Sequence, residues 1–126
     1  MGARVFARWI NGLYYRGFVQ SDNSTAVFIR YDDGDSSTLE KTDRAAVILD
    51  KLSCYSEVNP GQRVIGYWPG QTRYYPGVVV HKKYTGSAEC YQKAVYDVLF
   101  DDGDRRLQDF HQIRRIIGFI PLFPGE

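Results

Sequence analysis

The chain has 126 residues, of which 44% are hydrophobic and 25% are charged, a composition typical of a folded globular protein. It shows no apolar run long enough for a transmembrane helix and no signal-peptide pattern, so we expect a cytosolic or nuclear protein. Sixteen basic against fifteen acidic residues give a net charge of +1, which argues against neutralisation of nucleic-acid phosphates by the chain as a whole.

The first part of the chain contains short apolar runs that alternate with polar residues and are rich in β-branched and aromatic side chains. This pattern predicts strands rather than helices. The turn pairs Asn11-Gly12 and Asp33-Gly34 separate neighbouring runs and supply residues that tolerate positive φ. Five strands are predicted, over residues 4–9, 14–20, 26–31, 36–40 and 47–49. Residues 1–50 are therefore expected to form a small curled barrel.

The same pattern recurs in the second part, which is the signature of an internal repeat. RVFARW (4–9) matches RVIGYW (63–68), YYRGFV (14–19) matches YYPGVV (74–79), and FIRYDDGD (28–35) matches DVLFDDGD (97–104). Strands are predicted over 63–68, 74–81, 94–100, 104–107 and 113–117. The fold class is therefore expected to be all-β, with two tandem five-stranded SH3-like barrels.

The repeat also predicts the domain boundaries. Residues 51–62 end in the turn sequence Asn-Pro-Gly and are expected to be a linker between the barrels. The second barrel is expected over 63–117, with a longer loop at 81–94, and residues 118–126 are expected to form a C-terminal tail. Modules of about 50 residues bury little surface alone, so the two barrels are expected to pack together.

Neither a metal site, a cofactor nor an active site is predicted. Cys54 and Cys90 lack the paired spacing of a zinc site, and we expect both to be reduced structural residues. His81 and His111 complete no catalytic or metal-binding pattern. The Asp-Asp-Gly-Asp turns lack the downstream glutamate of a calcium-binding loop. We expect a non-enzymatic protein.

The aromatic content of 15% points instead to a binding site. Trp9 ends the first predicted strand, Tyr15 starts the second and Tyr31 ends the third, while Asp33 and Asp35 follow in the next turn. In a five-stranded antiparallel barrel these positions meet at one end. Three electron-rich rings beside carboxylates suit a methylated ammonium or guanidinium ion. We call these five residues the first-repeat cage.

In these segments the sequence resembles the Tudor family, and its repeat is similar to the tandem Tudor domains of chromatin proteins that read methylated histone lysine. The match lies in RVFARW, NGLYYRG and YDDGD and extends over nearly the whole chain. The resemblance assigns Trp9, Tyr15 and Tyr31 to cage walls and Asp33 to the carboxylate that meets the cation. The corresponding second-repeat cage comprises Trp68, Tyr75, Phe100, Asp102 and Asp104. Many such cages have an aromatic residue where Asp35 and Asp104 stand, so a three-walled, more open cage is expected.

This resemblance implies a nuclear protein, part of a larger chain, whose partner is a methylated histone tail or another methylated protein tail. A carboxylate in the cage favours mono- or dimethyl-lysine, because these states keep an N–H that bonds to Asp33 whereas trimethyl-lysine has none. Dimethyl-arginine is the alternative ligand, since a planar guanidinium fits between parallel rings.

A nucleic-acid-binding barrel is the second hypothesis. Residues 63–117 contain nine basic and six acidic residues, whereas residues 4–49 contain six of each. Six cations form a candidate basic patch for DNA or RNA: Lys82, Lys83, Arg105, Arg106, Arg114 and Arg115. Solvated surface charge is the simpler interpretation, and a purely structural interaction module is a third alternative.

Overall fold

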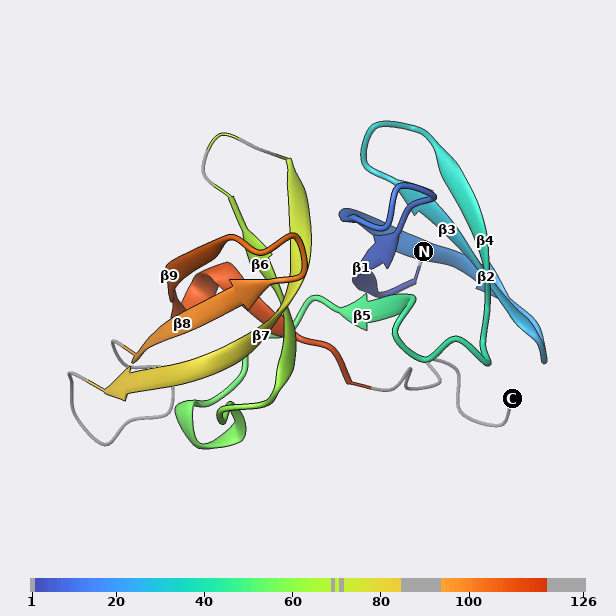
Figure 1. Cartoon of the computed structure of the whole chain (residues 1–126). Helices are drawn as coiled ribbons and strands as arrows, with labels where there is room; N and C mark the ends of the chain where they lie inside the picture. Colours follow the sequence, from blue (N-terminus) through green and yellow to red (C-terminus); the bar gives the residue numbers. More distant parts are fainter. Residues whose placement is uncertain (1, 69, 71, 85–93, 118–126) are drawn as a thin grey trace. The chain divides into compact units, whose positions relative to one another are not determined.

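The computed structural model describes residues 2–68, 70, 72–84 and 94–117. In these ranges the chain is built from ten strands and two single-turn 3-10 helices, so the predicted all-β class is confirmed. The described residues up to position 50 lie in one compact unit, and those from 51 to 116 lie in a second (Figure 1). None of the described segments is a helix of the length and apolarity needed to span a membrane.

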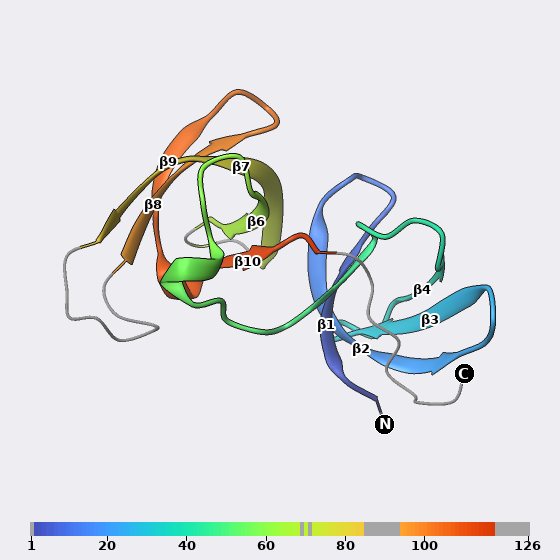
Figure 2. The ribbon, with the colours of Figure 1, turned by 90° about the horizontal axis from the view of Figure 1, so that it is seen from below.

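The first unit contains one five-stranded antiparallel sheet. Its strands are β1 (Arg4–Arg8), β2 (Tyr14–Asp22), β3 (Ala26–Tyr31), β4 (Ser36–Glu40) and β5 (Val47–Leu49). They pair in the order β5-β1-β2-β3-β4, and β2, β3 and β4 lie side by side in Figure 2. A register shift between Val19 and Ser21 marks a bulge in β2, a feature that bends a strand and increases its twist.

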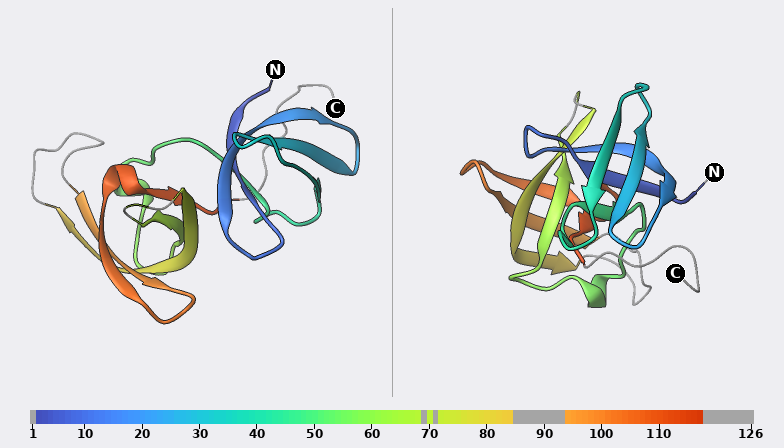
Figure 3. Two further views of the ribbon diagram at one scale, coloured as in Figure 1. Left: turned by 90° about the horizontal axis from the view of Figure 1, so that it is seen from above. Right: turned by 90° about the vertical axis from the view of Figure 1, so that its right-hand side faces the viewer.

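The second unit repeats this topology. Its elements are η1 (Tyr55–Glu57), β6 (Arg63–Tyr67), β7 (Arg73–Tyr84), β8 (Ala94–Phe100), β9 (Arg105–Asp109), η2 (Phe110–Gln112) and β10 (Ile113–Arg115). The strands pair in the order β10-β6-β7-β8-β9, and two further views show the two curved sheets (Figure 3). The register of β7 shifts between Val79 and His81, the position that matches the bulge in β2.

The predicted five-stranded barrels are not confirmed as closed structures. In the described residues, β4 pairs only with β3 and β9 pairs only with β8. The last strands of the two units, β5 and β10, pair with β1 and β6. In the described residues each sheet is therefore open, with β5 and β4 at the two edges of the first and β10 and β9 at the two edges of the second.

Each unit has its own apolar core, formed by the alternating residues that the strand patterns predict. In β3 the buried positions are Val27, Ile29 and Tyr31, and in β8 they are Ala94, Tyr96, Val98 and Phe100. The end of each series, Tyr31 or Phe100, is the aromatic residue expected in a cage. The core therefore extends directly to the candidate site in both units.

Two predicted boundaries differ from the structure. The expected linker 51–62 carries η1 and contributes Val58, which is 1% exposed, to the core of the second unit, because this apolar side chain packs beside Val64 and Val79 in the same cluster. The expected loop 81–94 begins inside β7, which continues to Tyr84 and pairs there with Ala94. Residues 85–93 and the expected tail 118–126 lie outside the described residues.

The expectation for the cysteines is wrong at Cys54, which is disulfide-bonded in the structure. Cys90 lies outside the described residues. Where the structure describes the chain, it holds no group of three or more His, Cys, Asp or Glu side chains placed to bind a metal ion.

Candidate functional site

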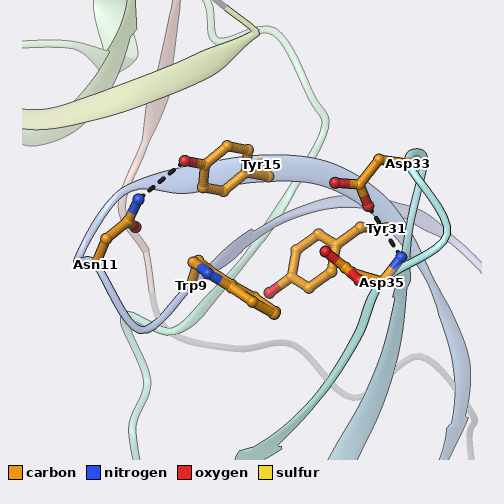
Figure 4. Close-up of a pocket in the computed structure, with 6 residues that line it drawn as sticks. All are labelled: Trp9, Asn11, Tyr15, Tyr31, Asp33 and Asp35. Carbon is orange, nitrogen blue, oxygen red and sulfur yellow. Dashed lines mark hydrogen bonds between the residues drawn. The ribbon is translucent and has the colours of Figure 1, made fainter.

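The predicted residues of the first-repeat cage come together around one cavity. Trp9, Tyr15, Tyr31, Asp33 and Asp35, together with Asn11, line a cavity of about 160 Å³ (Figure 4). The ring centroids of Trp9 and Tyr31 lie 5.4 Å apart with an interplanar angle of 86°. Those of Tyr15 and Tyr31 lie 6.3 Å apart at 85°. The rings of Trp9 and Tyr15 therefore both stand nearly perpendicular to the ring of Tyr31. Tyr31 forms the floor of the cavity and is only 4% exposed.

The strand register explains why these rings meet. Ala7 of β1 pairs with Tyr15 of β2, and Gly17 of β2 pairs with Tyr31 of β3. Residues two apart on a strand share one face of the sheet, so Tyr15 and the Gly17 position project to the same side. A Cβ at Gly17 would lie 2.6 Å from the carbonyl oxygen of Arg30. Glycine therefore allows β3 to approach β2 closely beneath the cavity.

The carboxylates are positioned by the hairpin turn that follows β3. The N–H of Gly34 donates to the carbonyl oxygen of Tyr31 at 3.0 Å, and the N–H of Tyr31 donates to the carbonyl oxygen of Asp35 at 2.8 Å. Gly34 has a φ of 97°, which glycine adopts without strain. The N–H of Asp35 also donates to the Asp33 carboxylate at 2.9 Å. These bonds hold both acidic residues at the rim of the cavity.

The hydroxyl of Tyr31 has a raised pKa. Burial is the main cause; a hydrogen bond with Ser37 lowers the pKa, and the negative charge of Asp33 raises it. The floor ring is therefore neutral at physiological pH. The Asp33 and Asp35 carboxylates that line the cavity place negative charge at its rim, which favours a cationic ligand.

Sequence reasoning missed Asn11, which it assigned only to the turn between the first two strands. The Asn11 amide donates a hydrogen bond to the Tyr15 hydroxyl at 2.9 Å, and its carbonyl oxygen accepts one from the N–H of Leu13 at 3.0 Å. These two bonds connect the turn to the cage wall and orient the Tyr15 ring. The corresponding sequence of the second repeat, PGQTR at 69–73, contains no asparagine, and this difference in sequence distinguishes the two repeats.

In the second unit the matching aromatic residues also meet, but in a different arrangement. The rings of Trp68 and Tyr75 are stacked, with centroids 4.4 Å apart and an interplanar angle of 23°. Phe100 lies edge-on to them at 5.8 Å and 6.4 Å. Rings stacked at this distance are in van der Waals contact, so no cation fits between Trp68 and Tyr75 in this arrangement.

An arginine of the same unit lies over the Trp68 ring. The guanidinium carbon of Arg106 lies 4.3 Å from the Trp68 ring centroid. Arg106 also donates to the Asp104 carboxylate at 2.9 Å, and Asp104 is held in its turn by a bond from its N–H to the Asp102 carboxylate at 2.9 Å. The second-repeat cage thus already contains an intramolecular cation–π contact.

Most cations of the predicted basic patch have partners within the unit. The Lys82 amine lies 3.9 Å from the Tyr55 ring centroid and donates to the Tyr55 carbonyl oxygen at 3.0 Å. Arg105 forms a salt bridge with Asp97 at 2.7 Å. The Arg105 guanidinium hydrogen-bonds to Asp97 and holds the pKa of that carboxyl below its usual range.

The two arginines of β10 are also bonded internally. Arg114 is 8% exposed and donates to the carbonyl oxygens of His111 and Ile113. Arg115 donates to the Ser53 hydroxyl at 2.8 Å and to Glu57 at 3.4 Å. Lys83 is exposed on β7. The six cations therefore do not form one open positive surface, which weakens the nucleic-acid hypothesis.

Comparison with known proteins gives a family and a fold. The family model described as domain of unknown function DUF4537 matches residues 2–116. A search of curated proteins gave no match. Among solved structures, the SHH1 SAWADEE domain in complex with an H3K9me3 peptide is similar, with a TM-score of 0.60, 17% sequence identity, and coverage of 91% of this chain and 98% of that one.

A selenium-substituted Arabidopsis thaliana SHH1 SAWADEE domain, carrying two leucine-to-methionine substitutions, matches with the same TM-score and identity and with 97% of its length covered. At 17% identity these matches establish the fold alone. They agree with the expected all-β fold class, but the identification of the chain as a tandem Tudor domain is not confirmed.

Proposed function

This chain belongs to the DUF4537 family, and we propose that its first unit is a non-enzymatic reader of methylated lysine on protein tails. The observation that carries this proposal is the cavity of about 160 Å³ enclosed by three aromatic rings and flanked by two carboxylates. Such a cavity provides ring faces for a methylated ammonium ion and negative charge at its rim. The SHH1 SAWADEE domain bound to an H3K9me3 peptide has the same overall fold, which supports this class of ligand.

The cage alone does not account for useful affinity. A cation–π contact contributes about 0.5 to 2 kcal/mol, so three rings contribute roughly 2 to 6 kcal/mol. Micromolar binding requires about 8 kcal/mol. The residues that flank the methylated lysine must therefore also contact the protein, and the ligand is a peptide segment rather than an isolated side chain.

The acidic rim favours lower methylation states. Dimethyl-lysine retains one N–H that donates a charge-assisted hydrogen bond to Asp33. Trimethyl-lysine lacks this donor and desolvates the carboxylate without a bond in return. We expect mono- or dimethyl-lysine to bind more tightly than trimethyl-lysine, although the similar SHH1 domain is complexed with a trimethylated peptide.

The wider assignment follows from this proposal. The two units act as a Tudor-like tandem, of which the first binds the ligand and the second contains an occupied cage. The partner is a methylated histone tail or another methylated protein tail, and the protein works in the nucleus as a module of a larger chromatin protein.

The test is an array of peptides carrying each lysine methylation state, probed with the parent chain and with two matched variants. Trp9→Ala removes a cage wall, and we expect it to weaken binding by about 2- to 30-fold, the equivalent of one cation–π contact. Trp68→Ala alters the occupied second-repeat cage and should leave the affinity unchanged. Methyl-dependent binding that survives in Trp9→Ala but is lost in Trp68→Ala would overturn the assignment.

Dimethyl-arginine is the second candidate ligand. Trp9 and Tyr15 both stand nearly perpendicular to Tyr31, which also suits a planar guanidinium lying on the floor between two walls. Arrays that include asymmetric and symmetric dimethyl-arginine peptides decide between the two cations. Tighter binding of dimethyl-arginine than of every lysine state would reassign the cage to this ligand.

A further inference from the structure

The two repeats differ at one position beside the cage. Two residues after Asp35 the first repeat has Ser37, and two residues after Asp104 the second repeat has Arg106. The strand register confirms that these positions match, because Ser37 pairs with Ile29 of β3 and Arg106 pairs with Val98 of β8. A short hydroxyl side chain in one unit therefore replaces a long cation in the other.

In the second unit this position builds a guanidinium site. Tyr75 stacks on Trp68 at 4.4 Å, and the Arg106 guanidinium lies 4.3 Å from the same ring centroid. Two groups at these distances must occupy opposite faces of the indole. The Asp104 carboxylate accepts a hydrogen bond from Arg106 at 2.9 Å. The outer face of Trp68 and the turn carboxylate thus hold an arginine side chain together.

In the first unit the matching space is open. Trp9 lines the cage and also a second cavity of about 530 Å³, whose other walls are Arg8, Ile10, Gly12 and residues 36–39 of β4. We call this cavity the Trp9 groove. Ser37, which occupies the position of Arg106, lines this groove and is too short to reach over the Trp9 ring. Asp35, which occupies the position of Asp104, is exposed.

The surroundings of the Trp9 groove suit a chain that lies across it. Ile10 is 93% exposed beside Trp9 and offers apolar contact for the stem of a long side chain. Arg8, the one cation among the described residues that line the groove, forms a salt bridge with Asp43, which offsets its repulsion of a second guanidinium. The groove therefore retains the indole face that binds Arg106 in the second unit, and Asp35, which lines the adjoining first-repeat cage, provides the carboxylate that corresponds to Asp104.

We propose that the Trp9 groove binds an unmodified arginine side chain of the same peptide whose methylated lysine occupies the first-repeat cage. Its guanidinium lies on the outer face of Trp9 and bonds to Asp35, as that of Arg106 does on Trp68 and Asp104. This inference rests on the proposed function and extends it, because it names a flanking residue that supplies part of the affinity the rings do not provide.

The experiment uses dimethyl-lysine peptides in which one arginine is moved through the positions before and after the modified residue. Citrulline at the same position is the control, since it keeps the shape but not the charge. We expect arginine to bind about three- to tenfold more tightly than citrulline at one position, as a cation–π contact with a partly exposed carboxylate implies.

Two variants locate the effect. Asp35→Asn should abolish the preference for arginine over citrulline, whereas Asp33→Asn should weaken both peptides and preserve the preference. Equal binding of arginine and citrulline peptides at every position, with both still weakened in Trp9→Ala, would overturn this inference and leave the proposed function standing. A preference that persists in Asp35→Asn would also overturn it, because the arginine would then bind elsewhere. If no methylated peptide binds at all, both proposals fail.

Discussion

Replacing Gly17 with alanine should destabilise the first unit and damage its cage. A Cβ at this position would lie 2.6 Å from the Arg30 carbonyl oxygen and 3.1 Å from the Cα of Tyr31. Ordinary contacts of a Cβ begin at 3.4 Å, so β3 must move away from β2 by about 0.8 Å, the difference between 3.4 and 2.6 Å. Overpacking of this kind costs about 1 to 3 kcal/mol.

The same substitution at Gly77 provides the matched control. Its Cβ would lie 2.7 Å from the Leu99 carbonyl oxygen, so the expected loss of stability is similar. Only Gly17→Ala displaces Tyr31, the floor of the first-repeat cage. We therefore expect both variants to unfold at lower denaturant concentration, but only Gly17→Ala to weaken binding of a dimethyl-lysine peptide in buffer where it is still folded.

Chemical denaturation followed by tyrosine and tryptophan fluorescence measures the stability, and calorimetric titration measures the affinity. Gly34→Ala separates crowding from backbone strain, since Gly34 has a φ of 97° and a Cβ added there would meet nothing within 4 Å. A Gly17→Ala variant as stable as the parent chain would refute the close approach of the two strands. Equal losses of affinity in Gly17→Ala and Gly77→Ala would refute the assignment of the site to the first unit.

Three further predictions concern the pH dependence and the support of the cage. Burial raises the pKa of Tyr96 to about 12, so the stability that its neutral form contributes is present below about pH 10 and is lost as the pH rises towards 12. Tyr96→Phe should flatten this alkaline loss in denaturation curves, and an unchanged curve would contradict it. The hydrogen bond from Arg63 lowers the pKa of Asp101, so the contribution of this exposed pair is present above about pH 4 and is lost on further acidification; Asp101→Asn should reduce the acid sensitivity measured by thermal melts. Asn11→Ala removes the donor to the Tyr15 hydroxyl and the acceptor of the Leu13 N–H, so it should weaken peptide binding by about two- to tenfold with only a small fall in melting temperature. An unchanged affinity would show that the bond to Tyr15 does not position the ring.

Much of the fold was predictable because the signals are local. The expected strands 26–31, 36–40, 47–49 and 94–100 coincide with β3, β4, β5 and β8. Alternating burial and the turn glycines determine such segments within a few residues. The extension of β7 to Tyr84 and the burial of Val58 were not predictable in this way. Both depend on what a segment contacts across the sheet or in the core, and no local pattern records that partner.

The candidate site was likewise predictable only in part. The sequence by itself determined that Trp9, Tyr15, Tyr31 and the turn carboxylates would meet, because their places at strand ends follow from period-two alternation and a shared hairpin geometry. The same reasoning predicted an equivalent second-repeat cage.

Only the tertiary structure decided that the two cages differ. Arg106, which its charge alone assigned to the basic patch, lies on Trp68, while Tyr75 stacks on that ring. Asn11, which the sequence pattern placed only in a turn, holds Tyr15. The orientation of a side chain depends on neighbours from other strands that compete for the same space, and this competition is settled by packing rather than by position in the sequence.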